Sequence, residues 1–127
     1  MNVLHIHVTP TEAAIAAVKQ QLAALDAGRS APSAQPTLSL PSVDALFSLL
    51  TPKRVELLRA LRQSDHPVSI RALAKSLQRD YKNVHGDTIA LIEAGLVERD
   101  TTGQVFTPWD RFEVHLPLQD APRDRAA

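Results

Sequence analysis

The segment SIRALAKSLQRDYKNVHGDTIALIEAG, residues 69–95, decides the fold because it has the pattern of two helices in close succession. Ser69 is a suitable N-cap for a first helix of about two turns. After a break of a few residues, Asp80 caps a longer helix that continues through Ala94, and Gly95 ends it. The segment therefore predicts two helices joined by a very short turn.

The longer helix has two distinct faces at about 100° per residue. The face predicted to pack inward carries Val84, Thr88, Leu91 and Ile92. The outward face carries Lys82, Asn83, Gly86, Ala90 and Glu93. Only the N-terminal half of the outward face carries basic and amide side chains, so we expect external contacts to be made there.

Gly86 lies near the centre of this outward face, although a glycine inside a helix costs roughly 1 kcal/mol relative to alanine. Two explanations are open. The missing side chain would let the helix backbone approach a ligand closely. Alternatively, the glycine is a tolerated substitution at a position where a contact has been lost.

Further elements surround this segment. The run SVDALFSLL, residues 42–50, predicts a short helix, and Thr51 and Pro52 begin another whose buried face is Val55, Leu58 and Leu61. Beyond the central segment, residues 96–108 predict a hairpin with a tight turn at DTTG, and the alternation in FEVHLPL predicts a last strand over 112–118. Mixed helices and strands predict an α+β fold.

The N-terminal part has a different character. Residues 4–8, LHIHV, alternate as in a half-buried strand, and a helix with one apolar stripe follows. We predict an N-terminal strand-helix arm over 1–28, a linker over 29–41 that contains three prolines, a main domain over 42–118 and a flexible tail over 119–127.

Charge is segregated along the chain, although the net charge is zero. Residues 53–86 have a balance of +5, whereas residues 87–118 have a balance of −4. The basic segment either forms a face for a polyanion or simply decorates solvated helices. There is no cysteine, and no segment has the roughly 18 apolar residues that would span a membrane, so we expect a cytoplasmic protein without a membrane partner.

The predicted order of helices followed by a hairpin is that of a winged helix-turn-helix domain, in which the third helix enters the DNA major groove. Asn83 suits adenine, Lys82 suits guanine or phosphate, and short polar residues occupy the wing. The predicted DNA-binding residues are Arg71, Lys75, Arg79, Tyr81, Lys82, Asn83, His85, Gly86, Thr101, Thr102 and Gln104.

The run SIRALAKSLQRDYKNVHGDTIALIEAGLVERD, with LTPKRVELLRAL before it and VFTPWDRFEVHLPL after it, resembles a family of small prokaryotic winged helix-turn-helix predicted transcriptional regulators. The resemblance covers about residues 40–118. Many members are antitoxin-like and are encoded beside a small putative toxin, so the resemblance implies double-stranded DNA and a toxin as partners. It also implies that Tyr81, Lys82, Asn83 and His85 face DNA, with Arg79 at the turn. The family commonly has arginine where this chain has Gly86.

Homodimerisation through the two ends of the chain is also predicted, because the terminal strands and the arm helix have apolar faces that a single winged helix does not need. Two-fold symmetry would place two reading helices on a palindromic operator. The predicted dimerisation residues are Leu4, Ile6, Val8, Ile15, Val18, Leu22, Leu25, Val114 and Leu116.

Other functions compete with DNA binding. His5, His7 and His115 would converge on a metal if their strands paired, but outward polar residues explain them and no carboxylate spacing was identified, so no metal and no cofactor are predicted. No phosphate loop or nucleophile motif is found, so no enzyme is predicted. The alternative function is a protein-protein adaptor, which would need exposed apolar residues on the outward face; Ile89 is its one candidate there.

Overall fold

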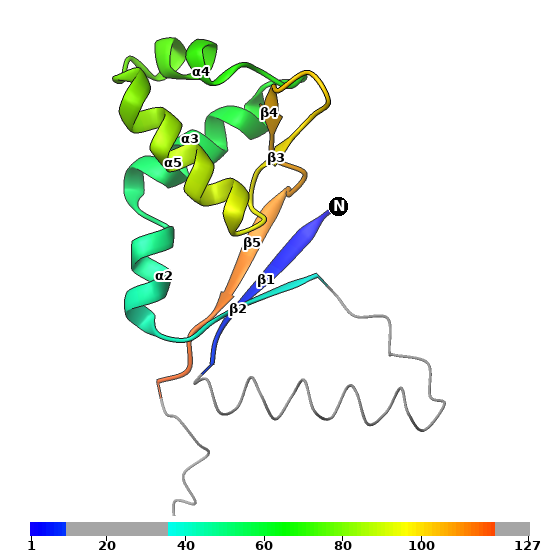
Figure 1. Ribbon diagram of the computed structural model, residues 1–127. Helices are drawn as coiled ribbons and strands as arrows, with labels where there is room; N and C mark the ends of the chain where they lie inside the picture. Colours follow the sequence, from blue (N-terminus) through cyan, green and yellow to red (C-terminus); the bar gives the residue numbers. More distant parts are fainter. Residues whose placement is uncertain (10–35, 119–127) are drawn as a thin grey trace, which may run out of the picture. The chain divides into compact units, whose positions relative to one another are not determined.

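The computed structural model describes residues 1–9 and 36–118, and this part of the chain contains both helices and strands (Figure 1). In chain order the elements are β1 (Val3–Val8), β2 (Thr37–Leu40), α2 (Val43–Leu49), α3 (Pro52–Gln63), α4 (Ile70–Leu77), α5 (Tyr81–Glu93), β3 (Glu98–Arg99), β4 (Val105–Phe106) and β5 (Arg111–His115). The predicted α+β class is confirmed at this level. None of the described helices is long and apolar enough to cross a membrane.

The chain divides into two compact units. Of the described residues, the helical unit comprises 1–3 and 47–111, and the sheet unit comprises 4–9, 36–46 and 112–118. Most of β5 belongs to the same unit as most of β1, although the two strands are far apart in the sequence.

In the helical unit α4 packs on α5, and α3 contacts both helices. The predicted inward face of α5 is confirmed for Val84, Thr88 and Leu91, all of which are fully buried. The predicted face of α3 was partly wrong, because Val55 is 39% exposed and Leu57 is buried in its place. Leu57 lies four residues before Leu61 and therefore on the same side of the helix.

The turn between α4 and α5 is built on Gln78, which has the left-handed backbone conformation with φ of 54°. Its N–H donates to the carbonyls at the end of α4, and the N–H of Arg79 donates to the carbonyl of Ala74 at 3.0 Å. Asp80 occupies the predicted N-cap position of α5, but its side chain makes no capping hydrogen bond. The turn therefore closes through backbone groups, and α5 starts directly after it.

The predicted hairpin is confirmed as the antiparallel pair β3–β4. Its turn closes around the Asp100 carboxylate, which accepts hydrogen bonds from the N–H and hydroxyl of Thr102 at 2.9 and 2.7 Å and from the N–H of Gln104 at 2.9 Å. Gly103 has φ of 85°, a conformation that favours glycine. Val68, just before α4, forms a bridge with Val105, so the hairpin is hydrogen-bonded to the start of the helical pair.

The sheet unit contains a three-stranded sheet in the order β2-β1-β5, with β1 in the middle. The predicted alternation of β1 is confirmed, since Leu4, Ile6 and Val8 are buried and the two histidines between them are half-buried. Strand β1 pairs in parallel with β2, with Ile6 opposite Leu38. The buried residues of β1 therefore line one face of this sheet, and the histidines line the other.

Strand β2 is a correction to the predicted linker over 29–41. Leu38 and Leu40 alternate with polar residues and are half-buried beside β1, but a proline on each side of these four residues obscured the short alternation.

The predicted dimerisation residues fall into three groups in the structure. Leu4, Ile6 and Val8 are buried within the chain, so they are core residues here and offer no exposed surface. Val114 and Leu116 are exposed by 45% and 37%. The predicted arm helix, with Ile15, Val18, Leu22 and Leu25, lies outside the described residues.

Candidate nucleic-acid interface

The N-terminal half of α5 presents the polar face that the sequence predicts. Lys82, Asn83, His85 and Gly86 are all exposed. The opposite face is anchored in the helical unit, and the one polar group buried there, the Thr88 hydroxyl, donates to the carbonyl of Val84 at 2.7 Å. Since the inward face is buried and satisfied, α5 is fixed in its rotation and these exposed residues stay on the outside.

Two ring contacts connect predicted residues at this surface, one between α4 and α5 and one within α5. The Arg71 guanidinium lies 4.7 Å from the centroid of the Tyr81 ring, close enough for a cation–π interaction. The Tyr81 ring in turn lies 5.7 Å from that of His85. Lys75, four residues after Arg71, is also exposed. Arg71, Tyr81 and His85 therefore form a connected row, with Lys75 beside Arg71 on the same helix.

Arg79 has a partner within the chain. Its Nη2 donates to Asp87 at 2.8 Å, and the other oxygen of Asp87 accepts from Nε of Arg54 at 3.1 Å. Burial raises the pKa of Asp87, but hydrogen bonds and charge from the two arginines outweigh this and hold the pKa below its ordinary value. The Arg54 guanidinium also donates to the carbonyl of Ser48 at 2.8 Å. This bridge joins α3 to α5. It also occupies hydrogen-bond donors of Arg79 that the sequence analysis assigned to phosphate contact.

An open groove of about 840 Å³ lies between the start of α3 and the first half of α5. Four basic side chains and one acidic side chain line it, a balance of +3: Lys53, Arg54, Arg79, Lys82 and Asp87. Asn83 and Gly86 also line the groove. A Cβ on Gly86 would meet no atom within 4 Å, so packing inside the chain does not require glycine at this position.

The predicted wing residues Thr101, Thr102 and Gln104 are exposed, as expected for a hairpin turn. The Thr102 hydroxyl is already bonded to Asp100. Hydrogen bonds from Thr102, together with those from the backbone of Gln104, hold the pKa of Asp100 below its usual range. The tip of the hairpin therefore carries a negative charge, which disfavours a close approach to phosphate.

The structure brings the predicted residues of α4 and α5 together and adds three that the sequence did not single out. Lys53 and Arg54 lie in the first turn of α3, and Asp87 joins Arg54 to Arg79. The excess of basic residues over 53–86 already indicated that Lys53 and Arg54 could belong to a basic surface. The pairing itself depends on how α3 packs against α5, which no local pattern reveals.

No curated protein matches the chain, and no solved structure matches it. The family model HVO_A0114 matches residues 49–114, a range that contains α3, α4, α5 and the β3–β4 hairpin. Because this match covers more than half of the chain, the protein belongs to the HVO_A0114 family.

Proposed function

We propose that this protein is a sequence-specific double-stranded DNA-binding transcriptional regulator whose helical unit is a winged helix-turn-helix domain. The order α3, α4, α5 and hairpin supports this interpretation, as does the bridge that joins the hairpin to the segment before α4. In this proposal α5 is the reading helix, and the hairpin is a wing that contributes little because of its charge.

The groove beside α5 is the observation that carries the proposal. A balance of +3 in one groove is unexpected for a chain with zero net charge, and it suits a phosphate backbone. Asn83 and Lys82, at the edge of that groove, have the side chains that read adenine and guanine in the major groove. Positive charge and base-reading groups therefore occur together on one exposed surface.

Other residues are assigned to positioning. Lys53, in the first turn of α3, would contact phosphate with help from the positive end of that helix. Arg71 and Lys75 would contact the backbone on the other side of α5, with Tyr81 holding the Arg71 guanidinium in place. Gly86 would allow the backbone of α5 to come close to the DNA.

The outward face of α5 favours DNA over a protein partner at this surface. An adaptor would present exposed apolar side chains there, but Ile89 is only half-exposed. The resemblance to antitoxin-like regulators implies a small toxin as a second partner.

A homodimer completes the proposal, because two copies would place two α5 helices on a palindromic site. Val114 and Leu116 are the described residues of the predicted interface that remain exposed. Sedimentation as a monomer at micromolar concentration would exclude this part of the proposal without affecting DNA binding by one copy.

Selection of binding sites from a random duplex library tests the reading function. We expect the wild-type protein to enrich a defined motif and Asn83→Ala to enrich a motif that has lost preference at one position, since an amide–adenine pair is worth about 1–3 kcal/mol of discrimination. The matched control is Gln63→Ala, which removes an exposed amide at the end of α3. If no motif is enriched by the wild type, the protein is not a sequence-specific reader.

A further inference from the structure

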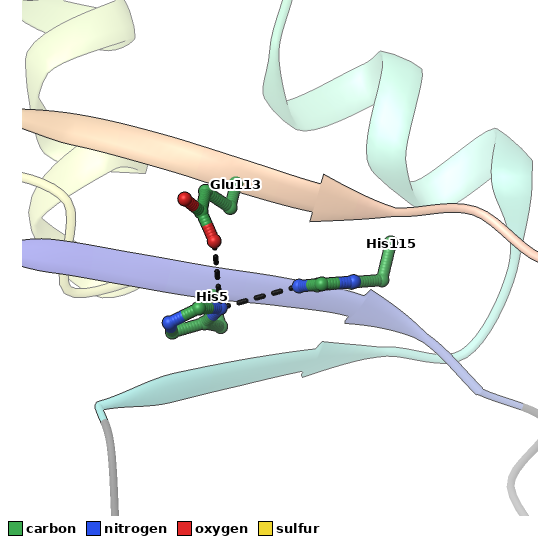
Figure 2. A group of neighbouring side chains, drawn as sticks. All are labelled: His5, Glu113 and His115. Atoms are coloured by element: carbon green, nitrogen blue, oxygen red, sulfur yellow. Dashed lines mark hydrogen bonds and ion pairs between the residues drawn. The ribbon is translucent and has the colours of Figure 1, made fainter.

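The sheet unit brings together three side chains that can bind a metal ion. His5 comes from β1, and Glu113 and His115 come from β5, the strand beside it. Figure 2 shows the three side chains close together beside these two strands, with the dashed lines from Glu113 and His115 both ending on His5. Each residue offers one ligand atom, and the three atoms lie within 4.8 Å of one another. Strands from opposite ends of the chain thus form one cluster.

The distances fit a small tetrahedral ion. Nδ1 of His5 lies 3.2 Å from Nε2 of His115 and 3.4 Å from Oε2 of Glu113. For metal–ligand bonds of about 2.0–2.1 Å, neighbouring ligands of a tetrahedral site lie about 3.3–3.4 Å apart. Two of the three separations therefore match the spacing that such an ion needs, and the third pair, Glu113 and His115, lies within 4.8 Å.

Hydrogen bonds among the three side chains explain these short distances less well than a bound cation does. Nδ1 of His5 faces both the His115 nitrogen and the Glu113 oxygen. A ring nitrogen carries at most one hydrogen, so a protonated Nδ1 makes one good hydrogen bond and an unprotonated Nδ1 repels the carboxylate. A cation between the three atoms would satisfy both close approaches at once.

We propose that His5, Glu113 and His115 form a binding site for a divalent transition-metal ion of the Zn²⁺ type. Two imidazoles and one carboxylate are a ligand set that Zn²⁺ uses when its fourth position is left to water. The His5 and Glu113 side chains are 17% and 38% exposed, so an ion can enter from solvent.

His7 has a positioning role in this proposal. Its ring stacks on that of His115, with centroids 4.4 Å apart and planes 7° apart. This contact restricts the orientation of the His115 ring, a role that a hydrogen bond to the second ring nitrogen commonly has at metal-binding histidines. The bound ion would join β1 to β5 and thereby fasten the two ends of the chain to each other.

Titration calorimetry of the full-length, untagged protein with ZnCl₂ tests the proposal. We expect one Zn²⁺ per chain for the wild type and a loss of more than about tenfold in affinity for His115→Ala and for Glu113→Gln. The control is His66→Ala, which removes an exposed histidine of the helical unit and should leave the affinity unchanged. Circular dichroism of each variant checks that it is folded.

A second measurement identifies the ligands. The visible spectrum of the Co²⁺-loaded protein should show tetrahedral coordination in the wild type and in His66→Ala, and it should be lost in His115→Ala. The proposal is overturned if the wild type binds Zn²⁺ no more tightly than folded His115→Ala, or if Glu113→Gln binds as the wild type does. Neither measurement involves DNA, so its outcome is independent of the proposed function.

Discussion

Replacing Gly86 with alanine should stabilise the protein. Gly86 lies inside α5, is exposed, and does not have the positive φ that Gly95 and Gly103 have. The added Cβ would meet no atom within 4 Å, so no packing cost opposes the change. Alanine is better than glycine in a helix interior by roughly 0.8–1 kcal/mol, which corresponds to a rise in Tm of roughly 4 °C for a chain of this size.

Thermal and urea unfolding followed by circular dichroism measure this difference. The reciprocal control is Ala90→Gly, one turn further along the same face of α5, which should lower stability by a similar amount. If Gly86→Ala leaves the stability unchanged or lowers it, the folded chain itself requires glycine at this position. That result would refute the reasoning that only an external contact requires it.

The same variant separates the two explanations of Gly86. If the backbone of α5 approaches DNA closely at this point, Gly86→Ala should weaken DNA binding although it stabilises the fold. If the affinity is unchanged, the glycine is a tolerated loss of a contact. Gly86→Arg should then raise the affinity and steepen its dependence on salt, since one more basic group would reach phosphate.

Three further predictions concern the surroundings of α5. Asp87→Asn should lower the free energy of unfolding by about 1–3 kcal/mol at neutral pH, because it weakens two charged hydrogen bonds. Because the pKa of Asp87 is lowered in the folded protein, the stability that this carboxylate contributes is present above the ordinary carboxyl pKa and is lost as the pH falls through the pKa of the folded state. Urea unfolding near pH 3 should therefore show a smaller difference in stability between the wild type and Asp87→Asn. An equal difference at both pH values would contradict the bridge. Asp100→Ala should open the hairpin turn, measured as faster hydrogen exchange at the amides of Thr102 and Gln104, whereas unchanged exchange would show that the carboxylate does not close it. Arg71→Ala should weaken DNA binding equally on all sequences and lower the salt slope by about one, and a changed base preference would refute its assignment to the backbone.

The helical unit could be predicted closely because its signals are local. The caps at Thr51 and Ser69 use side-chain hydrogen bonds to backbone groups three residues later, and both are present. The inward face of α5 follows from periodicity alone, and Val84 and Leu91 are fully buried as expected. Gln78 could not be predicted as the left-handed residue of the turn, because glutamine has no special preference for that conformation.

The sheet unit was predicted less completely, because its contacts join distant segments. Strand β2 is four residues long and gains its order from pairing with β1, which a linker-like composition concealed. The sequence predicts that His5 and His115 converge only on the condition that their strands pair, and no local pattern predicts that pairing. Glu113 was overlooked although it lies two residues before His115 and therefore on the same side of the predicted strand.

A gel-shift titration is the sharpest test of the claim that α5 and its basic groove bind DNA. The purified protein is titrated on its own upstream DNA and on an unrelated fragment of equal length, at two salt concentrations. We predict preferential binding to the upstream fragment, its loss in Lys82→Ala, and its retention in Arg59→Ala, which removes an exposed charge of α3 outside the groove. Equal binding to both fragments, or equal losses in the two variants, would contradict the claim.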